Sequence, residues 1–359
     1  MKKLMLPPIF LGLCLSLFGA EYIDGRIRLV LNENSGRFSL FFMSDIAREQ
    51  YQPFFTAEDP RTSFTAIQVN NRNYRLGEAS AFKTRLGGTP SNPALIFESS
   101  FLTVTEEFTF IRTGSSSLTN GVRITITVTN RGEQPVEAGV RFLIDTALGE
   151  KEAAHFVTDR RQIAGEALID GSSDDGYWVS RSGPLALMGS VGGENLTRPG
   201  SIHFANWKRL NDAPWKTPFV AGRNFNLLPY SIGDSAVCYY YEPETLPRSA
   251  SRTIALILSS EDESGFAGTN LPDELSRRIE ESGRLDGDLR RSMRTDLITL
   301  RDLVARLDEY AAGTPVSDEE LAAIGLLISK IRAKYGIAEY PPRRLLGEPP
   351  EAIPGDSPL

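Results

Sequence analysis

The chain has 359 residues, of which 24% are charged, and its formal net charge of −7 is spread along its length. Only two histidines are present, which excludes a histidine-rich metal site, and the acidic balance disfavours nucleic acid and anionic membrane surfaces as partners. The sequence has no phosphate-binding loop, no dinucleotide-binding glycine motif and no Gly-x-Ser-x-Gly nucleophile elbow, so we expect no cofactor.

The first 20 residues have the three parts of a secretory signal peptide. Met1-Lys2-Lys3 is positive, an apolar run extends from Leu4 to Phe18, and Gly19-Ala20 offers a cleavage site after Ala20. The run is shorter than the roughly 20 residues that span a bilayer. We therefore expect a soluble protein of the periplasm, less favourably a secreted one, without a transmembrane segment in the mature chain.

The two cysteines have different expected roles. Lipidation of Cys14 is disfavoured, because Leu13 stands where a lipobox has a small residue. After cleavage Cys238 is the only cysteine, so no intramolecular disulfide can form. Its strand-like surroundings predict a small buried core residue.

Residues 21–260 are predicted to form a β-sandwich domain. Arg26–Leu31 and Arg37–Phe42 alternate polar and apolar side chains around a turn, which predicts a hairpin. Gly121–Thr129 shows the strongest alternation, and Val136–Ile144 follows after a turn in which Gly132 is free to take a positive φ. The remaining expected strands are Ala94–Ser99, Leu102–Ile111, Tyr177–Ser180, Leu185–Ser190, Ser235–Tyr241 and Thr253–Leu258. The fold class is thus mainly β, a large antiparallel sandwich.

The composition changes after the last strand. Residues 261–272 read as an acidic flexible linker, 273–338 as a region with a C-terminal α-helical hairpin, and 339–359 as a proline-rich disordered tail. A short helix from Pro272 to Glu281 precedes two amphipathic helices, the second of which Ser317 and Glu320 begin as a capping box. The apolar stripes of these helices either pack on each other and on the β domain or, in part, dock a partner.

The loop after the predicted strand 136–144 holds the densest set of acid–base groups. Its candidate catalytic residues are Asp145, Glu150, Glu152 and His155. Carboxylates and an imidazole can be tuned towards neutral pH for proton transfer on a sugar. The alternative is that Asp145 satisfies backbone groups at a strand end while the glutamates are solvated.

Two further stretches are candidate binding sites. Asp170, Asp174 and Asp175, in a glycine- and serine-rich loop, are weak candidates for a Ca²⁺ site, although a simple turn is the commoner structure and we expect no metal. His203, Trp207, Trp215 and Arg223 are candidate ligand-binding residues, because tryptophan faces stack on sugars while polar groups fix hydroxyls. The alternative is that the tryptophans pack over an open end of the sandwich.

Several of these segments together resemble a known pattern. Asn130–Val136, Gly139–Gly149, Phe204–Trp207 with Trp215, and Asp234–Val237 followed by Tyr241-Glu242-Pro243 resemble segments of bacterial exported β-sandwich proteins that have no assigned activity. More distantly, the layout is similar to the galactose mutarotase-like, carbohydrate-processing class of large sandwiches, and more weakly to Ig-like accessory domains. The mutarotase resemblance implies a large two-sheet sandwich with a histidine and an acidic residue on its concave face, but neither His155 nor His203 aligns with that pattern.

These observations favour a non-enzymatic periplasmic protein of the cell envelope. Its sandwich would bind a protein partner or a glycan, and its C-terminal helices would make protein–protein contacts, as in an accessory of a periplasmic machine such as the motility apparatus. The alternative is a carbohydrate-active enzyme, epimerase-like or hydrolase-like, that uses the carboxylates and a histidine of the sandwich.

Overall fold

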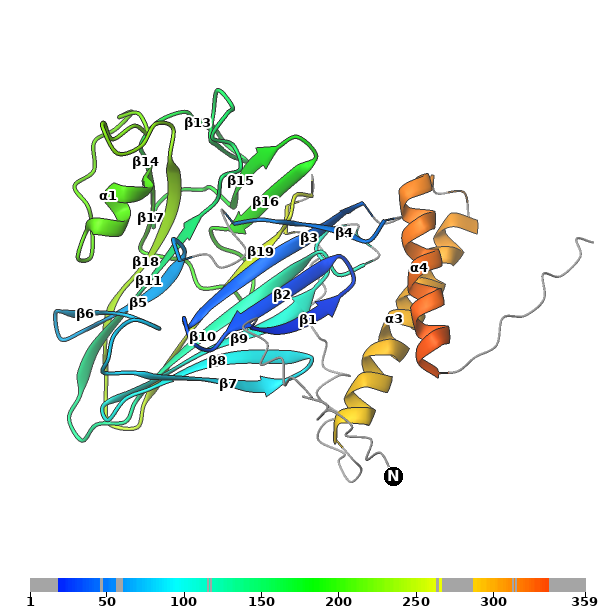
Figure 1. Cartoon of the computed structure of the whole chain (residues 1–359), viewed down its shortest axis with the longest axis horizontal. Coiled ribbons are helices and arrows are strands. Elements are labelled where there is room, and N and C mark those ends of the chain that lie inside the picture. The colour runs from blue at the N-terminus through cyan, green and yellow to red at the C-terminus, as the bar shows by residue number, and fades with distance from the viewer. Residues whose placement is uncertain are drawn as a thin grey trace, which may run out of the picture.

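The structure, a computed structural model, describes residues 19–45, 48–55, 61–114, 116, 118–262, 265–266, 287–311, 313 and 315–335. The signal peptide up to residue 18, most of the expected linker, the expected helix from Pro272 to Glu281 and the tail 339–359 lie outside the described residues. The chain is mainly β with a C-terminal helical hairpin, as the sequence predicts (Figure 1).

The strands alternate buried and half-exposed side chains as the sequence pattern requires. They are β1 (Ala20–Asp24), β2 (Ile27–Asn32), β3 (Arg37–Asp45), β4 (Gln50–Pro53), β5 (Phe64–Val69), β6 (Arg72–Arg75), β7 (Lys83–Thr89), β8 (Asn92–Glu98), β9 (Leu102–Ile111), β10 (Gly121–Asn130), β11 (Val136–Asp145), β12 (Phe156–Thr158), β13 (Gln162–Ile163), β14 (Ala167–Asp170), β15 (Tyr177–Ser182), β16 (Leu185–Ser190), β17 (Ser201–Asn206), β18 (Ser235–Leu246) and β19 (Ser251–Ser260). The helices are α1 (Trp207–Asp212), α3 (Gly287–Ala311) and α4 (Asp318–Tyr335).

The strands form three antiparallel sheets within the described residues. A nine-stranded sheet has the order β13-β12-β15-β16-β19-β10-β9-β8-β7, a six-stranded sheet the order β14-β17-β18-β11-β5-β6, and a four-stranded sheet the order β1-β2-β3-β4. The hairpin predicted around Arg26–Phe42 is confirmed as β2 and β3, with Leu29 opposite Leu40. Strand β11 lies between β18 and β5, so residues distant in sequence meet at its ends.

One apolar core joins the three sheets. Phe38 of the small sheet lies 4.8 Å from Phe108 of the nine-stranded sheet and 6.0 Å from Phe142 of the six-stranded sheet, measured between ring centroids. Trp178 is fully buried and its indole Nε1 donates to the Tyr239 hydroxyl. Cys238 is buried and free, as predicted, on the other face of the six-stranded sheet.

The predicted turn between β10 and β11 is present and does not use the conformational freedom of Gly132. Gly132 is not among the residues with positive φ. The Asn130 side chain instead shapes the turn, because its Oδ1 accepts from the Gly132 amide at 2.9 Å and its Nδ2 donates to the Gln134 carbonyl at 2.8 Å. An Asx turn of this kind closes the loop without a left-handed glycine.

The two C-terminal helices pack against each other in antiparallel fashion. The Lys334 ammonium lies 2.5 Å from the Asp296 carboxylate near one end, and Arg306 pairs with Glu320 at 3.4 Å near the other. The predicted cap at Ser317 is present, since its hydroxyl accepts from the Glu320 amide.

Helix α4 also packs on the β domain. Ala323 lies with Met43 and Leu118 in a small buried cluster, and Glu319 pairs with Arg26 at 3.0 Å. On α4, Ile324 and Ile331 of the apolar stripe are buried, whereas Leu321 is exposed. On α3, Val304 and Leu307 of the apolar stripe are exposed, and the neighbouring Leu303 is buried. Among the described residues no helix is both long and apolar enough to cross a membrane.

Glu106 occupies a core position on β9, between Val104 and Phe108. Burial raises the pKa of its carboxyl to about 7, and the Thr65 hydroxyl and the Arg37 guanidinium only partly oppose this. The unfolded chain ionises this group near 4.5, so raising the pH through this window favours unfolding. The difference between the pKa of 4.5 in the unfolded chain and about 7 in the folded protein corresponds to about 3 kcal/mol in the free energy of unfolding. This stability is lost once the pH exceeds about 7.

We expect Glu106→Gln to remove this pH dependence. The free energy of unfolding of the variant minus that of the wild type should rise by about 3 kcal/mol between about pH 4 and pH 8 in urea titrations. Glu133→Gln, at an exposed glutamate, is the control and should give a flat difference. A flat difference for Glu106→Gln as well would contradict the buried, protonated carboxyl.

Candidate active site

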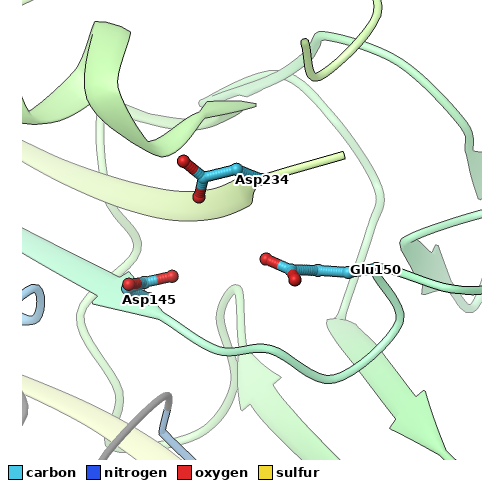
Figure 2. A group of neighbouring side chains, drawn as sticks. All are labelled: Asp145, Glu150 and Asp234. Carbon is cyan, nitrogen blue, oxygen red and sulfur yellow. The ribbon is translucent and has the colours of Figure 1, made fainter. Parts of the chain in front are cut away.

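Three carboxyl groups meet at one end of the six-stranded sheet. Asp145 is the last residue of β11, and its strand partner Ala236 lies two residues after Asp234 at the start of β18. The chain leaves β11 into a loop that returns Glu150 to the same place. In Figure 2 the three carboxylates point towards one another from β11, from the loop and from the segment before β18.

The three carboxyl groups are close enough to interact strongly. One oxygen of each lies within 4.8 Å of one oxygen of the others. Asp145 is buried and the other two are half-buried. Burial first, and then the charges of Asp145 and Asp234, raise the pKa of Glu150 to about 7, against a hydrogen bond from the Ser235 amide. Burial also raises the pKa of Asp234. At neutral pH the cluster therefore holds about one shareable proton among carboxylates.

His155 adjoins this cluster through Ser235. The Ser235 hydroxyl lies 2.8 Å from His155 Nδ1, while the Ser235 amide bonds the Glu150 carboxyl. The imidazole packs on the Phe225 ring with centroids 4.6 Å apart, and burial lowers its pKa. The histidine is thus held neutral beside the carboxyl groups, where it can accept a proton.

The loop that carries Glu150 and His155 is fixed by the core beneath it. Thr146 Oγ1 donates to the Phe54 carbonyl at 2.7 Å, and Ser180 Oγ contacts the carbonyls of Leu148 and His155. Gly149 has φ +79°, and a Cβ there would lie 2.2 Å from the His155 carbonyl oxygen. The loop therefore needs glycine at this position to bring its two ends together.

The predicted catalytic residues separate into two groups. Asp145, Glu150 and His155 lie close together, whereas Glu152 is exposed and is not part of the carboxyl cluster. Asp234 and Ser235 were not predicted. In the sequence, the only local sign of their role is that a carboxylate directly precedes a predicted strand. The pairing of β11 with β18 is what places Asp234 and Ser235 beside Asp145.

A second buried polar cluster centres on Glu166. Its carboxylate lies 3.0 Å from His203 Nε2, 2.6 Å from Arg223 Nε and 3.0 Å from the Val220 amide, with Arg209 at 3.7 Å. Burial raises the pKa of Glu166, but hydrogen bonds from Arg223, Val220 and His203 outweigh it, so the pKa is held below its usual value. Residues 207–234, here called the covering segment, run from α1 to the start of β18. Arg223 of this segment and His203 of β17 both bond Glu166, and these contacts hold the covering segment to the six-stranded sheet.

The two predicted tryptophans pack on the protein. Trp207 begins α1 and its indole Nε1 donates to the Thr62 carbonyl at 2.9 Å. Trp215 packs edge-on against Tyr240 at 6.1 Å between centroids. Both are half-buried on the face of the six-stranded sheet that carries Cys238. This is the packing role predicted from the sequence as the alternative to stacking on a sugar.

The predicted Ca²⁺ loop is a hydrogen-bonded turn. Asp170 Oδ1 accepts from the amide and the hydroxyl of Ser172, and Asp175 is buried beside Ser173. Asp174 is exposed. Among the described residues the set with the spacing of cation ligands is Asp145, Glu150 and Asp234. Three carboxylates carry six oxygen atoms, which is the lower end of the six to eight ligands that Ca²⁺ takes.

Comparisons with known proteins bear on the fold. No family model and no curated protein matches the chain. Among solved structures it is similar to a galactose mutarotase related enzyme from Lactobacillus acidophilus, with 8% identity, a TM-score of 0.38 and coverage of 70% of this chain and 99% of that chain. It is also similar to a galactose mutarotase-like protein from Lactobacillus casei, with 11% identity, a TM-score of 0.39 and coverage of 67% and 99%.

A third match, to a heparan sulfate lyase from Pedobacter heparinus, has 13% identity and a TM-score of 0.31, and it covers 66% of this chain and 33% of that chain. Proteins of the galactose mutarotase-like class, to which the sequence is distantly similar, are thus among the matched structures. Only the side chains of this chain bear on its chemistry.

Proposed function

We propose that the protein is a carbohydrate-active enzyme that transfers protons at the anomeric centre of a neutral sugar, in the cluster of Asp145, Glu150 and Asp234. The observation that carries this proposal is the Glu150 carboxyl, whose pKa is raised to about 7 by burial and by the two neighbouring carboxylates. An acid poised near neutral pH beside ionised carboxylates is the pairing that general acid–base catalysis requires.

The charge of the cluster supports a neutral, hydroxyl-rich substrate. Ionised carboxylates only accept hydrogen bonds, and sugar hydroxyl groups donate them. Phosphorylated or acidic substrates would be repelled by two carboxylates that lie within 4.8 Å of each other.

The roles of the residues follow from their protonation. Protonated Glu150 donates its proton to the ring oxygen, while Asp145 or Asp234 accepts the proton of the anomeric hydroxyl. The ring C–O bond breaks, an open-chain aldehyde forms, and the reverse transfer closes the ring on either face. His155 contacts the Ser235 hydroxyl, and the Ser235 amide donates to the Glu150 carboxyl. His155 therefore helps to position Glu150 by way of Ser235.

The short spacing of the carboxyl groups favours this chemistry over inverting hydrolysis. Inverting glycosidases place their two carboxyl groups about 6.5–9.5 Å apart to admit a water molecule. Here oxygens of all three groups lie within 4.8 Å of one another. The cluster therefore suits two neighbouring oxygen atoms of one sugar ring.

The test is the pH dependence of anomer interconversion. We expect freshly dissolved α-anomers from a panel of neutral aldoses to equilibrate faster with the protein, followed by polarimetry, and the catalysed rate to fall as the pH rises above about 7, because Glu150 loses its proton. The same rate is expected with a chelator present. Absence of catalysis on every aldose, or activity that requires a divalent cation, would contradict the proposal.

The periplasmic location and a binding or assembly role in the cell envelope remain predictions from the sequence. The exposed Val304, Leu307 and Leu321 on the helical hairpin are the residues through which a protein partner would be contacted. Partners of the envelope, whether protein or glycan, are likewise predictions.

A further inference from the structure

The turn from Leu227 to Asp234 displays an unusual set of exposed apolar side chains. Leu228, Tyr230 and Ile232 are exposed by 70%, 70% and 77%, more than any other large apolar residue among those the structure describes. They alternate along a tight turn, in which the Leu227 amide donates to the Ser231 carbonyl at 2.9 Å. Clustered apolar exposure of this kind marks a contact surface.

This turn is fixed to the carboxyl cluster. The Ser231 hydroxyl bonds the Asp234 carboxyl and accepts from Asn206 Nδ2 at 2.9 Å. The same Asn206 nitrogen donates to the Asp234 carbonyl at 3.0 Å, and Asn226 Oδ1 accepts from the Gly233 amide at 2.7 Å. These hydrogen bonds hold the turn that carries the exposed side chains in a fixed position relative to Asp234.

Tyr230 has the chemistry to contact a sugar ring. The Lys208 ammonium lies 5.3 Å from the centre of its ring and is itself held by Asp212 at 2.7 Å. The cation orients the ring, and the high exposure leaves most of its surface open. Aromatic rings pack on the apolar C–H faces of sugars, whose hydroxyl groups would then reach the carboxylates.

We propose that the turn Leu227–Asp234 is the substrate-binding wall of the carboxyl site, with Tyr230 stacking on the apolar face of a neutral sugar unit. This inference rests on the proposed function and extends it, because a wall beside the cluster would contact sugar units beyond the reacting one. The substrate class is thus a neutral oligosaccharide or polysaccharide end and not only a free monosaccharide.

Affinity electrophoresis tests this inference without requiring turnover. The protein is run through native gels cast with dextran, soluble starch, xylan or laminarin. We expect at least one polymer to retard the wild type, Tyr230→Ala to weaken that affinity by about tenfold, and Tyr230→Phe to retain it. Ile23→Ala, which truncates an exposed apolar side chain on β1, is the matched control and should migrate as the wild type does.

The outcomes separate this inference from the proposed function. If Tyr230→Ala binds as the wild type does while Glu150→Gln loses turnover, the wall is wrong and the catalytic site stands. If Tyr230→Ala loses binding while Glu150→Gln keeps turnover, the wall stands and the catalytic assignment fails. Retardation by none of the four polymers, or self-association that Tyr230→Ala abolishes in sedimentation, would overturn the inference.

Discussion

Replacing Glu150 with glutamine is expected to lower the rate of anomer interconversion by about 10²–10⁴-fold near pH 6. Glutamine has nearly the same shape and keeps an acceptor for the Ser235 amide, but it has no transferable acid proton. The loss should appear in kcat, because the hydrogen bonds that hold a bound sugar remain available. The pH dependence of the residual rate above about pH 7 should also disappear.

Stability measurements distinguish this loss from unfolding. Glu150→Gln removes one of three crowded carboxyl groups, so its melting temperature should equal or exceed that of the wild type. Glu152→Gln, two residues further along the same loop, is the matched control, since Glu152 is exposed and lies outside the cluster. An equal loss of activity in both variants would show that the loop, and not the Glu150 carboxyl, is required.

Replacing Glu166 with alanine should give the largest loss of stability in the β domain, about 3–5 kcal/mol in the free energy of unfolding. Its buried carboxylate accepts from Arg223, His203 and the Val220 amide, and removing it leaves these donors without their partner. The covering segment 207–234 should loosen first, which amide hydrogen exchange at Val220 would report.

The pH dependence of this contribution has a defined sign. Hydrogen bonds hold the pKa of folded Glu166 below the ordinary value of 4.5, so its contribution is complete above that value and is lost as the pH falls through the folded pKa. The exposed pair of Glu242 and Lys216 provides the control, and Glu242→Gln should cost at most about 1 kcal/mol. Equal, small losses for both variants would contradict the role of Glu166.

The sequence was most informative where the structure is local. Alternation along Arg26–Leu31 and Gly121–Thr129 predicted β2 and β10, because one face of each strand must be buried. The two amphipathic helices and the cap at Ser317 were predicted for the same reason, since helical periodicity and capping depend on neighbouring residues. The loop with Asp145, Glu150 and His155 was also recognised from one continuous stretch.

The remainder of the site depends on strand pairing. Asp234 joins Asp145 because β18 lies beside β11 with Ala236 opposite Asp145, and no local pattern encodes that register. The pairing of Glu166 with His203 and Arg223 likewise needs β14 beside β17 and the folding back of segment 207–234. Glu152 was included among the catalytic candidates because sequence proximity does not reveal which side chains face the sheet.

By itself, the sequence determined that this protein is a β-rich chain with an unpaired Cys238, a helical hairpin and a loop dense in acid–base groups. Each of these follows from composition or from short-range periodicity. Only the tertiary structure decided that Asp145, Glu150 and Asp234 form one cluster with a carboxyl poised near neutral pH. It did so because pKa values depend on burial and on charges brought together by distant strands, and the sequence order contains neither.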